Sequence, residues 1–151
     1  MFDSSNFFEL LGIERNFEID QEALYQNFLE LQKLLHPDKL ISKSHIEKLV
    51  AMEYAAKLNQ AYETLKDNKK RAEYLLFLKN IFINRESDNN VKADPIMLND
   101  ILELIEDPNI ELIASMKEEC WRIFKENYSN ENLEEAAQAM IKLQYLNKII
   151  E

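Results

Sequence analysis

The apolar residues of this chain recur at helical spacing. From Asp20, which can cap a helix, to Leu35 they fall at steps of four, three and four, and a stretch that begins near Ser44 has steps of three, four and three. Because an α-helix turns once every 3.6 residues, each set lies on one face of an amphipathic helix. The two sets are Leu24, Phe28, Leu31 and Leu35, then Ala55, Leu58, Tyr62 and Leu65. The pattern predicts two antiparallel helices of comparable length, packed along these stripes.

A short segment with basic residues separates the two predicted helices. It opens with His36, Pro37 and Asp38 and runs to Ser44, which can cap the following helix. Proline cannot continue a helix, and it drives the residue before it out of the α region. We therefore expect an exposed loop at the tip of the hairpin, with an imidazole and a carboxylate presented together to solvent.

The second half of the chain predicts three more helices. Asp94 and Pro95 form a helix start, with aspartate as the cap and proline at the first helical position, and this helix extends to about residue 106. Helices over roughly 109–127 and from about 130 to the end follow it. The polar segment 84–90 has no helical period. The predicted organisation is a domain over residues 1–80, a linker over 81–93 and a three-helix bundle over 94–151.

Two helices of the bundle carry more apolar positions than a small core needs. On the last helix, Ile141, Tyr145 and Ile149 form a stripe nearly opposite the core stripe. This stripe is either an exposed contact patch or a face that packs on the N-terminal domain. On the helix after Pro95, the residues expected to face the core are Ile101, Leu104 and Ile105.

The same helix has leucines at the border of its core face. Leu98 and Leu102 lie beside Asn99, Glu103 and Glu106. Apolar anchors rimmed by acidic residues are typical of protein interfaces. A solvated acidic helix face is the alternative interpretation.

Composition favours an all-α fold. The chain has one glycine and three prolines, and its hydrophobic content of 46% is enough for a core. The net charge of −10 is uneven, since residues 1–80 hold 11 basic and 13 acidic side chains and residues 81–151 hold 7 and 15. An acidic half cannot track a phosphate backbone, so nucleic acid is not an expected partner.

The sequence predicts neither membrane insertion nor export. No apolar run approaches the roughly 20 residues that a membrane helix needs, and the N-terminus has no signal or transit features. We expect a cytoplasmic protein without a membrane partner. The single cysteine, Cys120, can close no internal disulfide, and we expect it to be a small buried residue.

Three blocks around the tripeptide resemble known sequences. NFFELLGI over residues 6–13 and LNQAYETL over 58–65 resemble helices of the J-domain, with His36, Pro37 and Asp38 between them. J-domains are the modules with which DnaJ-type co-chaperones stimulate the ATPase of DnaK-type chaperones. With KRAEYLL over residues 70–76, the chain is similar over nearly its whole length to the HscB family, the J-proteins of iron–sulfur cluster assembly.

The resemblance implies two partners. An HscA-type or other DnaK-type ATPase chaperone would contact the hairpin through His36, Pro37, Asp38, Lys33 and Lys39. An IscU-type iron–sulfur scaffold would contact the bundle through Leu98, Asn99, Leu102, Glu103, Glu106 and Tyr145. Asn99 stands where the family has methionine, Tyr145 where phenylalanine is common, and Asn27 where a basic residue is usual. Lys33, Lys39, Lys43 and Lys48 could steer association with an acidic surface. Because Asn27 and Glu30 make the helix over residues 20–35 less basic, we expect weak, transient docking that is sensitive to salt.

Other functions can be assigned to the same residues. His36 and Asp38 could serve as the acid–base pair of a small hydrolase or as metal ligands, but each role needs a third convergent group. A general DnaJ-like co-chaperone with other clients is the second alternative. The chain lacks the Gly/Phe-rich segment and the zinc-binding cysteines of that form. We expect no enzyme activity, no cofactor and no metal.

Overall fold

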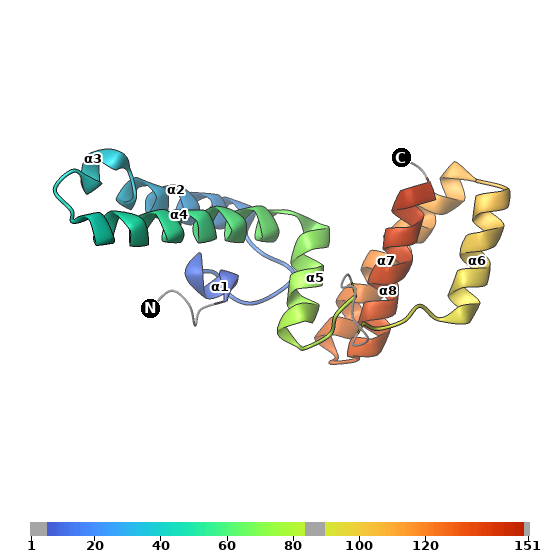
Figure 1. Cartoon of the computed structure of the whole chain (residues 1–151). Coiled ribbons are helices and arrows are strands. Elements are labelled where there is room, and N and C mark those ends of the chain that lie inside the picture. The colour runs from blue at the N-terminus through green and yellow to red at the C-terminus, as the bar shows by residue number, and fades with distance from the viewer. Residues whose placement is uncertain (1–5, 84–89, 150–151) are drawn as a thin grey trace. The chain divides into compact units, whose positions relative to one another are not determined.

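The computed structural model describes residues 6–83 and 90–149, and its contacts divide the chain into two compact units, residues 1–71 and 72–151 (Figure 1). All regular elements of these described ranges are helices, apart from one isolated parallel bridge between Phe82 and Asn90. The all-α prediction is therefore confirmed. In the segment predicted as a linker, residues 84–89 lie outside the described residues, and the predicted domain limits stay a prediction.

The first unit is built on a helical hairpin. Its elements are α1 (Phe7–Leu10), α2 (Gln21–Leu34), α3 (Pro37–Leu40) and α4 (His45–Lys66). The side chain of Asp20 caps α2 by accepting the Ala23 N–H, and that of Ser44 caps α4 by accepting the Glu47 N–H. The hairpin is antiparallel, since the Gln21 amide at the start of α2 donates to the Lys66 carbonyl at the end of α4, 3.3 Å away. The predicted caps and hairpin are confirmed.

The two hairpin helices differ in length, so the prediction of comparable lengths is wrong. Helix α2 has 14 residues and α4 has 22. The buried residues of α4 are Leu58, Ala61 and Leu65, all in its C-terminal half. The hairpin core therefore occupies one end of α4, because α2 is too short to cover the other end.

Two polar side chains fasten the base of the first unit. The Asn27 amide of α2 donates to the Leu11 carbonyl at 2.8 Å, which holds the end of α1 where Gly12 turns the chain with φ +66°. Arg71 is buried, and its guanidinium donates to the Phe17 carbonyl at 2.8 Å and the Leu65 carbonyl at 2.6 Å. Burial lowers the pKa of Arg71, and Glu18 and Asp67 oppose that shift.

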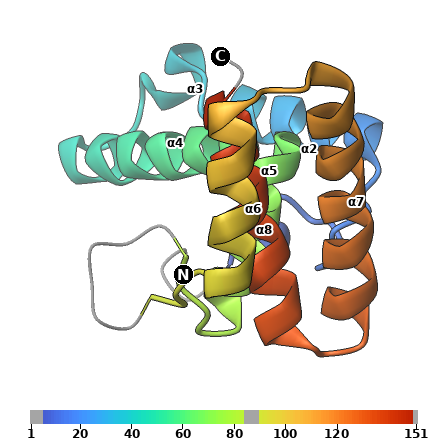
Figure 2. The same cartoon turned by 90° about the vertical axis from the view of Figure 1, so that its right-hand side faces the viewer.

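The second unit is a three-helix bundle preceded by most of α5. Helix α5 (Asn68–Leu78) begins in the first unit, and α6 (Pro95–Glu106), α7 (Ile110–Ser129) and α8 (Leu133–Ile149) follow. Asp94 and Asn109 cap α6 and α7, and Asp94 was the predicted cap. Helix α8 packs along α7 and also contacts α6, so it lies between them (Figure 2). This arrangement buries most of α8, including Ala136, Met140, Leu143 and Leu146.

One prediction about the bundle faces is wrong, and a second is met only in part. Ile105 was expected in the core but is 55% exposed, because it lies at the border of the core face, turned about 40° from Ile101 toward Leu102. The stripe predicted as either an exposed patch or a packed face is divided, since Ile141 is 5% exposed and Tyr145 is 37% exposed. The buried position predicted for Cys120 is confirmed.

Candidate functional site

The tip of the hairpin is a one-turn helix and not the loop that the sequence predicted. Pro37 occupies the first helical position of α3, where its missing N–H costs nothing. His36 precedes it as the cap, with extended backbone angles (φ −60°, ψ 140°) that a residue before proline prefers. Proline therefore starts a helix here, which sets the relative position of its two neighbours.

His36 and Asp38 lie side by side on this turn. The Asp38 N–H donates to His36 Nδ1 at 3.2 Å, and Asp38 Oδ2 lies 3.5 Å from the same nitrogen. Because Nδ1 accepts a hydrogen bond, the neutral imidazole carries its proton on Nε2. The side chains are 59% and 83% exposed, so the ring and the carboxylate are both accessible to another protein.

The surroundings of His36 do not resemble a catalytic centre. A pocket of about 270 Å³ behind the ring is lined by Gln32, Leu35, His36, Pro37, Ala55, Leu58 and Asn59. Apart from His36 itself, these lining residues include no acid, base or nucleophile. Within residues 6–83 and 90–149, no group of three His, Cys, Asp or Glu side chains could hold a metal ion. The geometry offers rigid presentation of two groups, which suits recognition.

Few cations accompany the tip. Lys33 lies in the last turn of α2, Lys39 lies in α3, and both are exposed. Lys43 is close to Glu47, with 4.0 Å between Nζ and Oε2. Asn27, which stands where a basic residue was expected, is half-buried and holds Leu11. The structure thus gives Asn27 a role within the fold.

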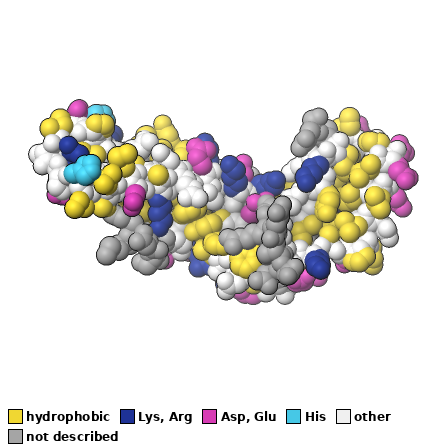
Figure 3. Space-filling view, viewed as in Figure 1, with side chains coloured by type: hydrophobic (Ala, Val, Ile, Leu, Met, Phe, Trp, Pro, Cys, Tyr) yellow, Lys and Arg dark blue, Asp and Glu magenta, His cyan; other side chains and the backbone are white. Residues whose placement is uncertain are grey.

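Four apolar residues beside the tip have no role in the predicted contacts. Ile41, Ile46, Leu49 and Val50 are all exposed. Hydrophobic side chains gather next to the histidines at this end of the unit (Figure 3). The available signal was the spacing of Ile46, Leu49 and Val50, which places them together on α4 but away from its core stripe.

The second candidate surface lies on α6 and α8. Leu102 is 57% exposed, Tyr145 is 37% exposed and Leu98 is half-buried, while Asn99, Glu103 and Glu106 are exposed. Hydrophobic side chains cover the neighbouring parts of α6 and α8 in Figure 3. The six residues predicted for a scaffold contact are therefore accessible, and Ile105, which was expected in the core, adds an exposed apolar residue.

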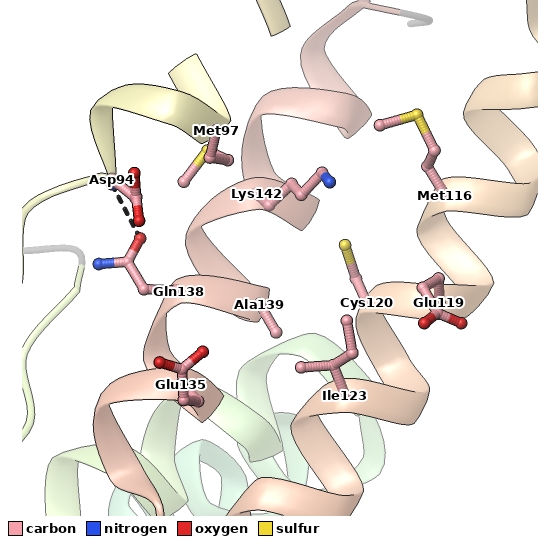
Figure 4. A pocket seen from close by; sticks show the side chains of 10 residues that line it. All are labelled: Asp94, Met97, Met116, Glu119, Cys120, Ile123, Glu135, Gln138, Ala139 and Lys142. Carbon is pink, nitrogen blue, oxygen red and sulfur yellow. Dashed lines mark hydrogen bonds between the residues drawn. The ribbon is translucent and has the colours of Figure 1, made fainter. Parts of the chain in front are cut away.

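A pocket of about 210 Å³ opens between α6, α7 and α8 (Figure 4). Met97, Met116, Cys120 and Ala139 supply apolar walls, and Glu119, Glu135 and Lys142 are among its charged lining residues. Gln138 closes one end by accepting the Asp94 N–H at 3.0 Å and donating to the Lys92 carbonyl at 2.7 Å. Burial raises the pKa of the Cys120 thiol, which keeps it protonated and unreactive near neutral pH.

The comparisons with known proteins cover both units. The family model of the DnaJ domain matches residues 6–74. The co-chaperone protein HscB homolog of Aliivibrio salmonicida is 36% identical, over 95% of this chain and 92% of the relative. A second homolog of this name, from Aliivibrio fischeri, is 34% identical over the same shares of the two chains.

Solved structures agree with these relatives. Chaperone HscB from Vibrio cholerae has a TM-score of 0.75 at 33% identity, over 95% of this chain and 92% of that one. Human co-chaperone protein HscB has a TM-score of 0.82 at 25% identity, over 97% and 79% of the two chains. No helix among the described residues is long and apolar enough to cross a bilayer. The N-terminal DnaJ domain, the helical second unit and the near full-length matches agree, and the chain belongs to the HscB family of co-chaperones.

Proposed function

We propose that this protein couples two partners in iron–sulfur cluster assembly. Its first unit binds an HscA-type chaperone of the DnaK class and stimulates the ATPase of that chaperone. Its second unit binds an IscU-type scaffold, which carries the cluster as cargo, and delivers it to the chaperone. The protein itself acts by binding in the cytoplasm, without catalysis, a cofactor, nucleic acid or a membrane.

The observation that carries this proposal is the presentation of His36 and Asp38 on α3. Both side chains project from a single helical turn whose geometry is set by Pro37, within the segment that matches the DnaJ domain. A surface built this way loses little conformational entropy when a partner binds, because the backbone is already ordered. The accessible Nε2–H and carboxylate can then each form a hydrogen bond with the chaperone.

The composition of α6 and α8 supports the scaffold as the second partner. The exposed apolar residues there are flanked by Glu103 and Glu106, in the half of the chain that holds 15 acidic and 7 basic side chains. Apolar anchors with an acidic rim favour a partner that has an apolar patch surrounded by basic residues. We assign the contact to Leu98, Asn99, Leu102, Glu103, Glu106 and Tyr145.

A substitution at the tip tests the chaperone half. We expect His36→Gln to abolish stimulation of the chaperone's steady-state ATPase, because glutamine cannot reproduce the ring and its paired nitrogens. The far-UV circular dichroism spectrum should not change, since His36 is exposed.

His45→Gln is the matched control. His45 is the only other histidine of the chain, is also exposed, and begins α4 nine residues after His36. We expect this variant to stimulate the ATPase as the unmodified protein does. Full stimulation by His36→Gln would remove the tip from the mechanism.

A further inference from the structure

Helix α4 extends well beyond the helix that it packs against. The last residues of α2 share a pocket with Ala55, Leu58 and Asn59, so α2 ends beside this part of α4. Helix α4 begins ten residues before Ala55, at His45. At 1.5 Å per residue, roughly 15 Å of α4 lies beyond the end of α2. Residues 41–50 are all exposed, in agreement with this difference in length.

The projecting part of α4 carries an apolar face. Ile46, Leu49 and Val50 are 72%, 47% and 45% exposed, and we call these three residues the overhang strip. At 100° per residue they fall within an arc of roughly 100°. That arc is turned about a quarter of a turn from Leu58, Ala61 and Leu65, so the strip does not continue the core stripe. Three large aliphatic side chains at adjacent surface positions are typical of an interaction surface.

The charges around the overhang strip favour a protein partner over a lipid surface. From His36 to Glu53 the chain has three lysines and three acidic residues, so it offers no net positive charge to anionic lipids. Helix α2 has Glu22 and Glu30 against Lys33. Electrostatic attraction through α2 is therefore weak, and a stable contact at this end of the unit needs apolar area.

We propose that the overhang strip is a second contact with the ATPase chaperone, continuous with the tip. Ile41, 72% exposed, lies at the end of α3 and extends the apolar surface from the turn of His36 and Asp38 toward α4. One partner that covers the tip can therefore also bury the strip. This inference rests on the proposed function, and it adds the residues that keep the complex together.

The two parts of the surface then act on different steps. His36 and Asp38 are required for stimulation once the chaperone is bound. The overhang strip slows dissociation, because apolar burial contributes mainly to the lifetime of a complex. Salt screens charges but not apolar contacts, so the expected salt sensitivity of docking should appear in the association rate. The dissociation rate should change less than about two-fold between low and moderate salt.

The test compares Ile46→Ala/Leu49→Ala/Val50→Ala with the unmodified protein. Alanine is the best helix former, so α4 is retained while the apolar side chains are truncated. Met52→Ala is the control, because Met52 is also exposed but lies outside the arc of the strip, about 60° from Leu49 and 120° from Ile46. Biolayer interferometry with immobilised chaperone measures both rates, and ATPase stimulation is measured at saturating co-chaperone.

We expect the triple variant to dissociate at least ten-fold faster, with an unchanged association rate and full stimulation at saturation. Met52→Ala should match the unmodified protein. An unchanged dissociation rate for the triple variant would overturn the inference and leave the proposed function intact. An unmodified protein that neither binds nor stimulates the chaperone would overturn both.

Two further measurements distinguish other occupants of the strip. Loss of self-association by the triple variant in sedimentation, with its chaperone kinetics unchanged, would assign the strip to a second copy of the chain and overturn the inference. If the unmodified protein floated with anionic vesicles and the triple variant did not, again with unchanged chaperone kinetics, the strip would bind a lipid surface. That result would also overturn the inference.

Discussion

The two units expose apolar side chains for different structural reasons. In the first unit α4 is eight residues longer than α2, so Ile46, Leu49 and Val50 lie where the partner helix has ended. In the second unit α8 lies between α6 and α7, which leaves the outer side of α6 with Leu102 and Ile105 uncovered. The first surface is exposed because α2 is shorter than α4. The second is exposed because only one side of α6 is covered.

The surroundings of the two surfaces also differ in charge. The tip region from His36 to Glu53 has as many basic as acidic side chains, whereas Glu103 and Glu106 flank the apolar residues of α6. Charge arranged around an interface decides which partners are repelled, while apolar area contributes to affinity. Two such surfaces on one chain are suited to two partners of different charge, and each can be removed by substitution without the other.

The largest expected effect lowers the stability of the first unit and leaves that of the second unchanged. Arg71→Met should lower the free energy of unfolding of the first unit by about 3 kcal/mol, because the buried carbonyls of Phe17 and Leu65 lose their donors. Trp121, the only tryptophan, lies on α7 and reports on the second unit. Urea unfolding followed by circular dichroism and by tryptophan fluorescence measures the two transitions.

Arg71→Lys is the control for charge alone. Lysine keeps the charge but lacks the planar group that donates to Phe17, Leu65 and Asn68 together, so most of the loss should remain. If Arg71→Met shifted the transition seen by Trp121 fluorescence as much as the one seen by circular dichroism, the two units would unfold together. That result would contradict their separate stabilities.

A second comparison distinguishes two residues of one apolar stripe on α8. Ile141→Ala should cost about 2–4 kcal/mol, because Ile141 is almost fully buried and its truncation leaves a cavity. Tyr145→Ala, one turn further along, should cost less than about 1 kcal/mol, because Tyr145 is exposed. Urea unfolding monitored at Trp121 compares them. Equal losses would mean that Tyr145 supports the fold and is not available to a partner.

Local sequence signals predicted the helices and their caps well. Asp20, Ser44 and Asp94 each accept the backbone N–H that the sequence pattern implied, since a capping interaction involves only neighbouring residues. Gly12, directly after the C-cap of α1, has the positive φ that glycine commonly adopts at the end of a helix. The helix over residues 37–40 was missed, because proline both ends one helix and favours the start of the next.

Tertiary packing decided what the periodicity could not. The stripe of Ile141 and Tyr145 was correctly identified as apolar, but one member is buried and the other is not, because neighbouring helices cover part of the stripe. The same holds for Ile105 and for the overhang strip. A period shows which residues share a face, whereas exposure depends on where the neighbouring helix lies and ends.

The most direct test of the account is a calorimetric titration of the protein with an IscU-type scaffold. Leu98→Ala/Tyr145→Ala should bind tens-fold more weakly, at about 1–2 kcal/mol for each anchor. Ile96→Ala is the matched control, because Ile96 is an exposed apolar residue of α6, like Leu98, but lies outside the assigned contact. This variant should bind the scaffold normally. Normal binding by the double variant would contradict the assigned surface. No binding by the unmodified protein would contradict the dedicated iron–sulfur role and leave a J-domain co-chaperone with another client.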